Sequence, residues 1–260
     1  MLLNSFAAPW TEPIARCAQM MEVARTINAE QGIFVWADYS IAFTRSQSLF
    51  FGQANLDETH QENAKWLGFH TANGDPQVIG NQAFILHFIE AMQGRRVENP
   101  VEHAAFDESL YAHTVSQQQN PTFLAHYEVL NQVDDYLSGE YKACVLRGVA
   151  LFKTIIDIFG MNLDIIHRYF YVLAYLALDK RSLNRGQRIK AYGYYRLNRF
   201  YLHLFEKNHP ANYGGHYALM LAEWHGRQEH LKEALSHYER AITLSKKISL
   251  FNEALCNERL

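Results

Sequence analysis

The stretch GRQEHLKEALSHYERAI, from Gly226 to Ile242, decides how the rest of the chain is interpreted. Its small or apolar residues recur at a spacing of three and four: Leu231, Ala234, Leu235, Tyr238, Ala241 and Ile242. This spacing predicts an amphipathic helix. The stretch is therefore either an ordinary packed helix or one helix of a repeated hairpin.

Two further pairs of residues favour a repeat. Leu221 and Ala222 place a large residue before a small one, and Leu255 and Cys256 do so again 34 residues later. A period of 34 residues built from paired helices is that of the tetratricopeptide repeat, or TPR. We therefore predict one hairpin over residues 215–247 and the first helix of another hairpin from Ser249 onward.

A weaker copy of the pattern begins at GEYKAC, Gly139 to Cys144. Glycine ends one helix there, an aromatic residue follows two positions later, and Cys144 takes the place of a small residue. Gly148 and Leu151 do not reproduce the aromatic–alanine pair of the next turn, and the distance from Cys144 to Ala234 is not a multiple of 34. We therefore expect an irregular repeat, which matches best over residues 140–260 and less well over 1–139.

Helical periodicity extends along the whole chain, with Asp75-Pro76 and Asn120-Pro121 as helix starts in which an N-cap precedes proline. The predicted helices span residues 12–30, 33–51, 56–72, 76–93, 106–118, 121–137, 140–159, 163–178, 182–207, 211–225, 229–247 and 250–260. Short loops between helices imply antiparallel neighbours. The predicted fold is all-α, a single domain over 1–260 that forms an irregular TPR-like superhelix of antiparallel helical hairpins.

The composition is that of a globular protein and sets limits on the partners. The chain has 260 residues, 48% of them hydrophobic, and a net charge of −3. This charge predicts no general attraction to nucleic acid or acidic membranes. The most apolar run, YFYVLAYLAL, is too short to span a bilayer and is expected to be a buried helix. Three separated cysteines and the lack of a signal peptide predict a cytoplasmic protein.

No motif in the sequence carries chemistry. The phosphate-binding pattern GxxxxGK[ST] and the DFG and HRD motifs of kinases do not occur. The thirteen histidines do not form helical pairs with a nearby carboxylate. We therefore predict no catalytic residue, no metal site and no cofactor, and a protein that is not an enzyme.

The most unusual charged segment runs from Lys180 to Phe205 and contains no acidic residue. Four of its arginines are spaced to share helix faces: Arg185, Arg188, Arg196 and Arg199. Such a stripe suits an acidic peptide, a phosphate group, nucleic acid or an acidic neighbouring domain. The alternative is a basic helix that is solvated or paired with acidic helices of the same chain. Interleaved aromatic residues are expected to lie mostly in the core.

Alignment of the best hairpin with the repeat predicts which residues face a groove. Stacked hairpins leave a concave surface that binds a polypeptide segment. The groove-facing positions of the first helix are His216, Leu219 and Glu223, and Asn252 is the matching position on the next helix.

The segment from Lys190 to Leu260 resembles the TPR-like helical region of very large bacterial signalling proteins. Its ALSHYERAITLSKK helix and the following EALCNE helix carry the likeness, and LFFGQ and LSGEYKACV upstream are similar to the same region. Those proteins combine a Ser/Thr kinase-like module, a predicted ATPase, the helical region, a GAF domain and a histidine kinase. The chain ends within a hairpin, so the resemblance implies an excised repeat region or a truncated stand-alone relative.

The resemblance implies a non-catalytic module for protein–protein interaction and coupling within a sensor kinase or ATPase protein. Its partner would be a protein or peptide segment, including neighbouring domains of the same polypeptide, and neither nucleic acid nor a membrane. The alternative is a stand-alone helical-repeat regulator that senses a peptide. Regulators of that class begin with a DNA-binding helix-turn-helix or a three-helix bundle, and the N-terminus here offers no recognition helix.

Overall fold

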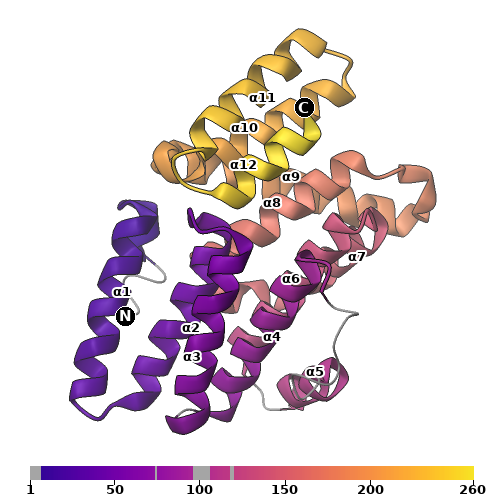
Figure 1. Cartoon of the computed structure of the whole chain (residues 1–260). Coiled ribbons are helices and arrows are strands. Elements are labelled where there is room, and N and C mark those ends of the chain that lie inside the picture. The colour runs from indigo at the N-terminus through magenta and orange to yellow at the C-terminus, as the bar shows by residue number, and fades with distance from the viewer. Residues whose placement is uncertain (1–6, 74, 96–105, 118–119) are drawn as a thin grey trace.

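The computed structural model describes residues 7–73, 75–95, 106–117 and 120–260, which form helices joined by short turns (Figure 1). The α-helices are α1 (Ile14–Glu30), α2 (Phe34–Phe51), α3 (Leu56–Asn73), α4 (Pro76–Met92), α5 (Glu108–Gln117), α6 (Pro121–Leu137), α7 (Tyr141–Ala150), α8 (Asn162–Ala177), α9 (Arg185–Asn208), α10 (Pro210–Arg227), α11 (Leu231–Ser245) and α12 (Leu250–Arg259). In the same described residues, 3-10 turns accompany them: η2 (Ala8–Trp10), η3 (Leu151–Lys153), η4 (Ile155–Ile158) and η5 (Lys180–Ser182). The described residues contain no strand, and the predicted all-α class is confirmed.

Local capping explains where several helices begin. The side chain of Asp75 accepts a hydrogen bond from the backbone N–H of Gln77 (2.7 Å), and Asn120 accepts one from Phe123 (3.3 Å). Each cap satisfies a backbone donor that the first turn of a helix leaves free, and proline follows where no donor is needed. Both predicted helix starts are confirmed.

The predicted helix over residues 140–159 is wrong in its second half. Helix α7 ends at Ala150, and the chain continues through η3 and η4. Thr154 favours the tighter winding, because its backbone N–H and its hydroxyl both donate to the Leu151 carbonyl, at 3.0 and 3.1 Å. Leu151, Ile155 and Ile158 are all buried by these turns. The tighter turns therefore satisfy the same apolar spacing that a continuous helix would have used.

Helix α8 forms the centre of the molecule. Every residue from Asn162 to Leu176 is buried, which confirms the expectation of a buried helix for the YFYVLAYLAL run. Helices α6, α7, α9 and α10 pack around it. A helix that is covered on all sides carries apolar residues around its whole circumference, as this one does. No helix in the described part of the chain combines the length and the apolarity that crossing a membrane requires.

Two charged residues inside α8 fix its orientation against α9. Asp164 Oδ1 and Arg168 Nε form a buried ion pair of 2.8 Å within α8. Arg168 also donates to Asn198 Oδ1 on α9 (2.9 Å), and its guanidinium lies 4.1 Å from the centre of the Tyr201 ring. Burial raises the pKa of Asp164, while the charge of Arg168 opposes the rise. These contacts hold one face of α9 inward.

The two ends of the described chain meet. In Figure 1 the C-terminal helices α10–α12 lie above the ends of α1–α3, with α6–α9 to the right. Ser249 donates its hydroxyl to the Phe50 carbonyl (2.5 Å), and the Leu250 N–H donates to the Gly52 carbonyl (3.0 Å). The start of α12 therefore packs on the end of α2, although about two hundred residues of sequence separate the two helix ends.

Candidate interaction surface on helix α9

Helix α9 begins with a complete capping box. Asn184 Oδ1 accepts from the Gln187 N–H (2.9 Å), and the Gln187 side chain accepts from the Asn184 N–H (3.0 Å). This arrangement satisfies two of the donors that the first helical turn leaves free. The helix is 24 residues long and has no acidic side chain before Glu206.

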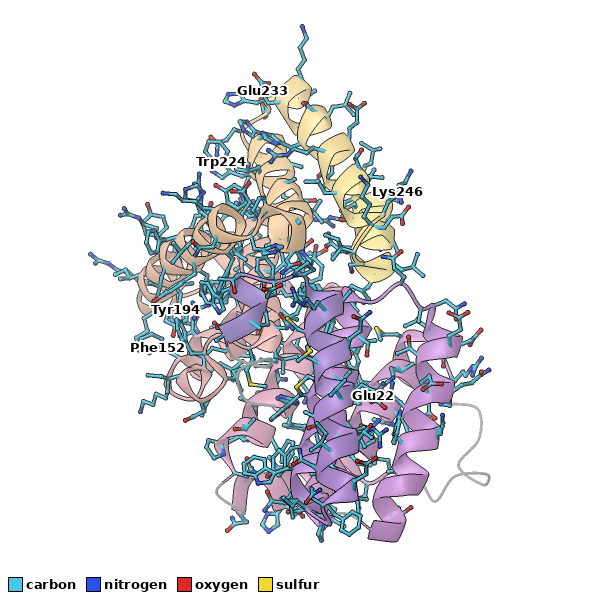
Figure 2. All side chains as sticks on the ribbon, turned by 90° about the vertical axis from the view of Figure 1, so that its left-hand side faces the viewer. Glu22, Phe152, Tyr194, Trp224, Glu233 and Lys246 are labelled. Atoms are coloured by element: carbon cyan, nitrogen blue, oxygen red, sulfur yellow. The ribbon has the colours of Figure 1, made fainter. Side chains whose placement is uncertain are left out.

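The inner face of α9 is anchored by aromatic side chains. Tyr171 on α8 donates its hydroxyl to the Ala191 carbonyl (2.9 Å), and the Tyr195 ring stacks on Tyr175 at 4.5 Å. Figure 2 shows Phe152 and Tyr194 side by side, and their ring centres are 4.9 Å apart. These contacts leave the opposite side of the helix facing outward.

The outward side carries a regular row of large residues, which we call the α9 outer face. The row consists of Arg185, Ile189, Tyr192, Arg196, Arg199 and His203, flanked by Arg188 and Phe200. Its successive members are four and three residues apart, so they lie one above another along the helix. Ile189 is 65% exposed, Tyr192 52% and Phe200 60%. The expectation that the aromatic residues here lie mostly in the core is therefore wrong for Tyr192 and Phe200.

The arginines of this face keep their charge unpaired. Within the described part of the chain, no carboxylate forms an ion pair with Arg185, Arg188, Arg196 or Arg199, whereas Glu206 at the end of the same helix pairs with Arg240 (3.5 Å). Arg188 donates to the Leu183 carbonyl (3.1 Å), and Arg199 lies 4.9 Å from the centre of the Trp224 ring. The four charges are thus available to a partner, and pairing with neighbouring acidic helices does not account for them.

A hollow lies beside this row, between α9 and α10, with a volume of about 380 Å³. It is lined by Tyr192, Tyr195, Arg196, Arg199, Phe200 and His203 from α9 and by Tyr217 from α10. The rings of His203 and Tyr217 lie 5.4 Å apart across it. Aromatic walls with two arginines suit an apolar side chain next to a negatively charged group.

The predicted groove positions on the other side of α10 are not exposed, which corrects that prediction. His216, Leu219 and Asn252 are buried. The His216 ring lies between Phe51 (5.1 Å) and Tyr169 (4.8 Å), and burial lowers its pKa to about 3. The end of α2 and helix α8 cover the face of α10 that was expected to line a groove, so these residues support the core.

Asn252 and Glu223 join helices of the C-terminal hairpins. Asn252 accepts from the Tyr169 hydroxyl (2.6 Å) and donates to Ser245 Oγ (2.7 Å). Glu223 accepts from the Tyr238 hydroxyl (2.8 Å) and from Arg259 Nε (2.9 Å) and Nη2 (3.1 Å). The hydrogen bond to Glu223 raises the pKa of Arg259. Glu223 therefore ties α10 to α11 and α12.

The remaining candidates for a site are a group of histidines and the three cysteines. The rings of His225, His230 and His237 gather at one end of the α10–α11 hairpin, with His225 5.8 Å from His230 and 5.2 Å from His237. No group of three or more histidine, cysteine or acidic side chains that the structure describes has the geometry to hold a metal ion. Cys17, Cys144 and Cys256 are buried, and burial raises the pKa of all three thiols.

Sequence reasoning found the four arginines of the outer face but missed Ile189, Tyr192, Phe200, His203 and Tyr217. The alternation of four and three from Arg185 to His203 was a signal for most of them, because it places cations and apolar residues on one helix side. Tyr217 carries no such signal, since it comes from another helix. No known family model, curated protein or solved structure matches this chain.

Proposed function

We propose that the chain is a non-catalytic module for protein–protein interaction and coupling, of the TPR-like kind present in large bacterial signalling proteins. The observation that carries this proposal is the α9 outer face, where unpaired arginines alternate with exposed Ile189, Tyr192 and Phe200. Exposed apolar side chains beside arginine and tyrosine are typical of protein-binding surfaces. The partner is a cytoplasmic protein or a neighbouring domain of the same polypeptide.

The packing of α9 supports the coupling part of the proposal. Its inner face is tied to α8 by the Arg168–Asn198 and Tyr171–Ala191 hydrogen bonds. Helix α8 in turn reaches α12 through the bond from Tyr169 to Asn252, and it packs on α2. Helix α9 is thus linked through the contacts of α8 to both α12 and α2.

Site-specific photo-crosslinking tests the proposal. A photoreactive amino acid replaces Tyr192 in the chain expressed in its native host, and crosslinked proteins are identified by mass spectrometry. We expect one or a few defined partners. The double charge reversal Arg185→Glu/Arg196→Glu should lower their yield about tenfold, because neither side chain has an ion-pair partner among the described residues and the loss is electrostatic.

A matched double reversal near the two ends of α11, Lys232→Glu/Lys246→Glu, changes the net charge by the same amount on a different exposed surface. It should leave the crosslinks intact. The proposal fails if the same products form from the exposed Leu235 on α11, or if the two double variants reduce the yield equally.

A further inference from the structure

The middle of α9 contains a glycine that the fold itself does not require. Gly193 is exposed, and a Cβ atom added there would meet no other atom within 4 Å. Glycine weakens the interior of an exposed helix, because it gains more freedom in the unfolded chain than any other residue. Gly193 lies next to Tyr192 and one turn before Arg196, beside the row of the outer face. The space it leaves permits another backbone to approach α9 closely.

The spacing of the row matches a second helix. Arg185, Ile189, Tyr192, Arg196, Arg199 and His203 alternate by four and three residues, which is the spacing of a helix seam that faces another helix. At 1.5 Å per residue the row is about 27 Å long. An extended strand repeats the side chains of one face every ~6.6 Å, whereas a helix repeats them every ~5.4 Å, so only a helix keeps its contacts in step with the row over this length.

The charge of the row determines the charge of its partner. Arg185, Arg188, Arg196 and Arg199 surround Ile189 and Tyr192 and have no carboxylate partner in the described chain. Nucleic acid is a poorer match for this surface. Duplex DNA presents a charge every ~1.7 Å, and its phosphate backbone would make no favourable contact with an exposed isoleucine or with the open space at Gly193. An acidic polypeptide can pair its carboxylates with the arginines and pack its apolar side chains on Ile189 and Tyr192.

We propose that the α9 outer face is the docking site for an acidic amphipathic helix of a partner protein. Apolar side chains of that helix lie on Ile189, Tyr192 and the hollow beside Phe200, its Asp and Glu residues pair with the arginines, and its backbone passes close to Gly193. This inference rests on the proposed function and adds to it the shape and the charge of the bound segment.

Synthetic peptides test the inference on the whole chain by fluorescence anisotropy. The probe is a helix of about 20 residues, long enough for the row, with leucine along one seam and glutamate on both flanks. A scrambled peptide of the same composition controls for charge, and a DNA duplex serves as competitor. We expect the amphipathic peptide to bind at least about tenfold more tightly than the scrambled one, with weaker binding at higher salt.

Gly193→Leu separates close approach from simple charge attraction. It adds a good helix former to an exposed site, so the melting temperature should rise by about 2–4 °C, while peptide affinity falls about tenfold. Gly68→Leu, at another exposed helix glycine without neighbours, should raise the melting temperature and leave binding unchanged. Arg185→Glu/Arg196→Glu should abolish binding that Lys232→Glu/Lys246→Glu preserves.

Three results would overturn the inference: equal binding of the scrambled peptide, full affinity of the Gly193→Leu variant, or displacement of the peptide by duplex DNA at equal charge concentration. Each leaves the proposed function standing if the crosslinked cellular partner still depends on Arg185 and Arg196. Loss of that dependence, with peptide binding intact, instead contradicts the proposed function.

Discussion

Three histidines of the core differ from the exposed ones in a way that only the folded chain reveals. Burial lowers the pKa of His126 to about 4 and of His167 and His216 to about 3. His167 Nδ1 bonds Gln132 Oε1 (2.7 Å), while both ring nitrogens of His126 have no partner in the described chain. Sequence spacing cannot make this distinction, because histidine occurs on buried and exposed helix faces alike.

These histidines make stability depend on pH. Between about pH 6.5 and pH 4 these histidines bind protons in the unfolded chain but stay neutral in the folded chain. The free energy of unfolding therefore decreases as the pH falls through this range. Each ring contributes a slope of about 1.4 kcal/mol per pH unit. His126→Leu should remove about a third of the combined slope, as measured by urea unfolding from pH 7 to pH 5. His113→Asn, at an exposed position, should change nothing, and an unchanged slope for His126→Leu would contradict this account.

At the scale of single helices, local signals predicted most of the structure. The caps at Asp75 and Asn120 act within one turn, so the sequence alone places those helix starts. The break after Ala150 was not predictable in this way, because Leu151, Ile155 and Ile158 keep a spacing of four and three in either winding. The outward turn of Tyr192 was also missed, since it depends on which side of α9 the Arg168–Asn198 bond holds inward.

Two glycines in neighbouring helices should respond oppositely to the same substitution. A Cβ atom on Gly148 of α7 would overlap the Tyr171 ring and lie 2.8 Å from Gln132 Nε2, whereas one on Gly193 meets nothing. Gly148→Ala should destabilise the fold by about 1–3 kcal/mol through overpacking. Gly193→Ala should stabilise it by about 0.5–1 kcal/mol through helix propensity.

Thermal and urea unfolding of the two variants measure this difference. Equal effects of the same sign would show that helix propensity, and not the approach of α7 to α8, controls position 148. The Tyr171 ring lies against position 148, so this position has no room for the aromatic residue expected there after GEYKAC.

At the scale of the whole molecule, long-range contacts decided what the repeat pattern left open. The large–small pair at Leu221-Ala222, repeated at Leu255-Cys256, correctly predicted paired helices. It carries no information about which other segments cover those helices. The residues over His216 come from the end of α2, far away in sequence, and helix α12 begins on that same end. The face expected to form a groove is therefore part of the core, whereas Ile189, Tyr192 and Phe200 of α9 are exposed.

One residue, Asn212 of α10, holds the start of the described chain against this C-terminal region. Its Nδ2 donates to the carbonyls of Pro9 (3.0 Å) and Glu12 (2.8 Å), and its Oδ1 accepts from the Ile14 N–H (3.2 Å). All three partners belong to the segment before and at the start of α1, where the Pro9 carbonyl also accepts from the Tyr213 hydroxyl (2.9 Å) and the Ile14 carbonyl accepts from the Gln47 side chain (3.0 Å). A buried amide with three such bonds acts as a clamp on the backbone.

Asn212→Ala should therefore destabilise the chain by about 2–3 kcal/mol, because it leaves the Ile14 N–H and the Glu12 carbonyl without their partner, whereas the Pro9 carbonyl keeps the Tyr213 hydroxyl. Hydrogen–deuterium exchange gives the sharper measurement. Protection should fall at the Ile14 amide and through the first turns of α1, and then at the Leu250 amide, which bonds Gly52 at the end of α2. Helix α11 has no hydrogen bond or ring contact with this segment in the described part of the chain and should keep its protection. A uniform loss of protection would show instead that the two ends open only with global unfolding, and that Asn212 contributes to the core as a whole.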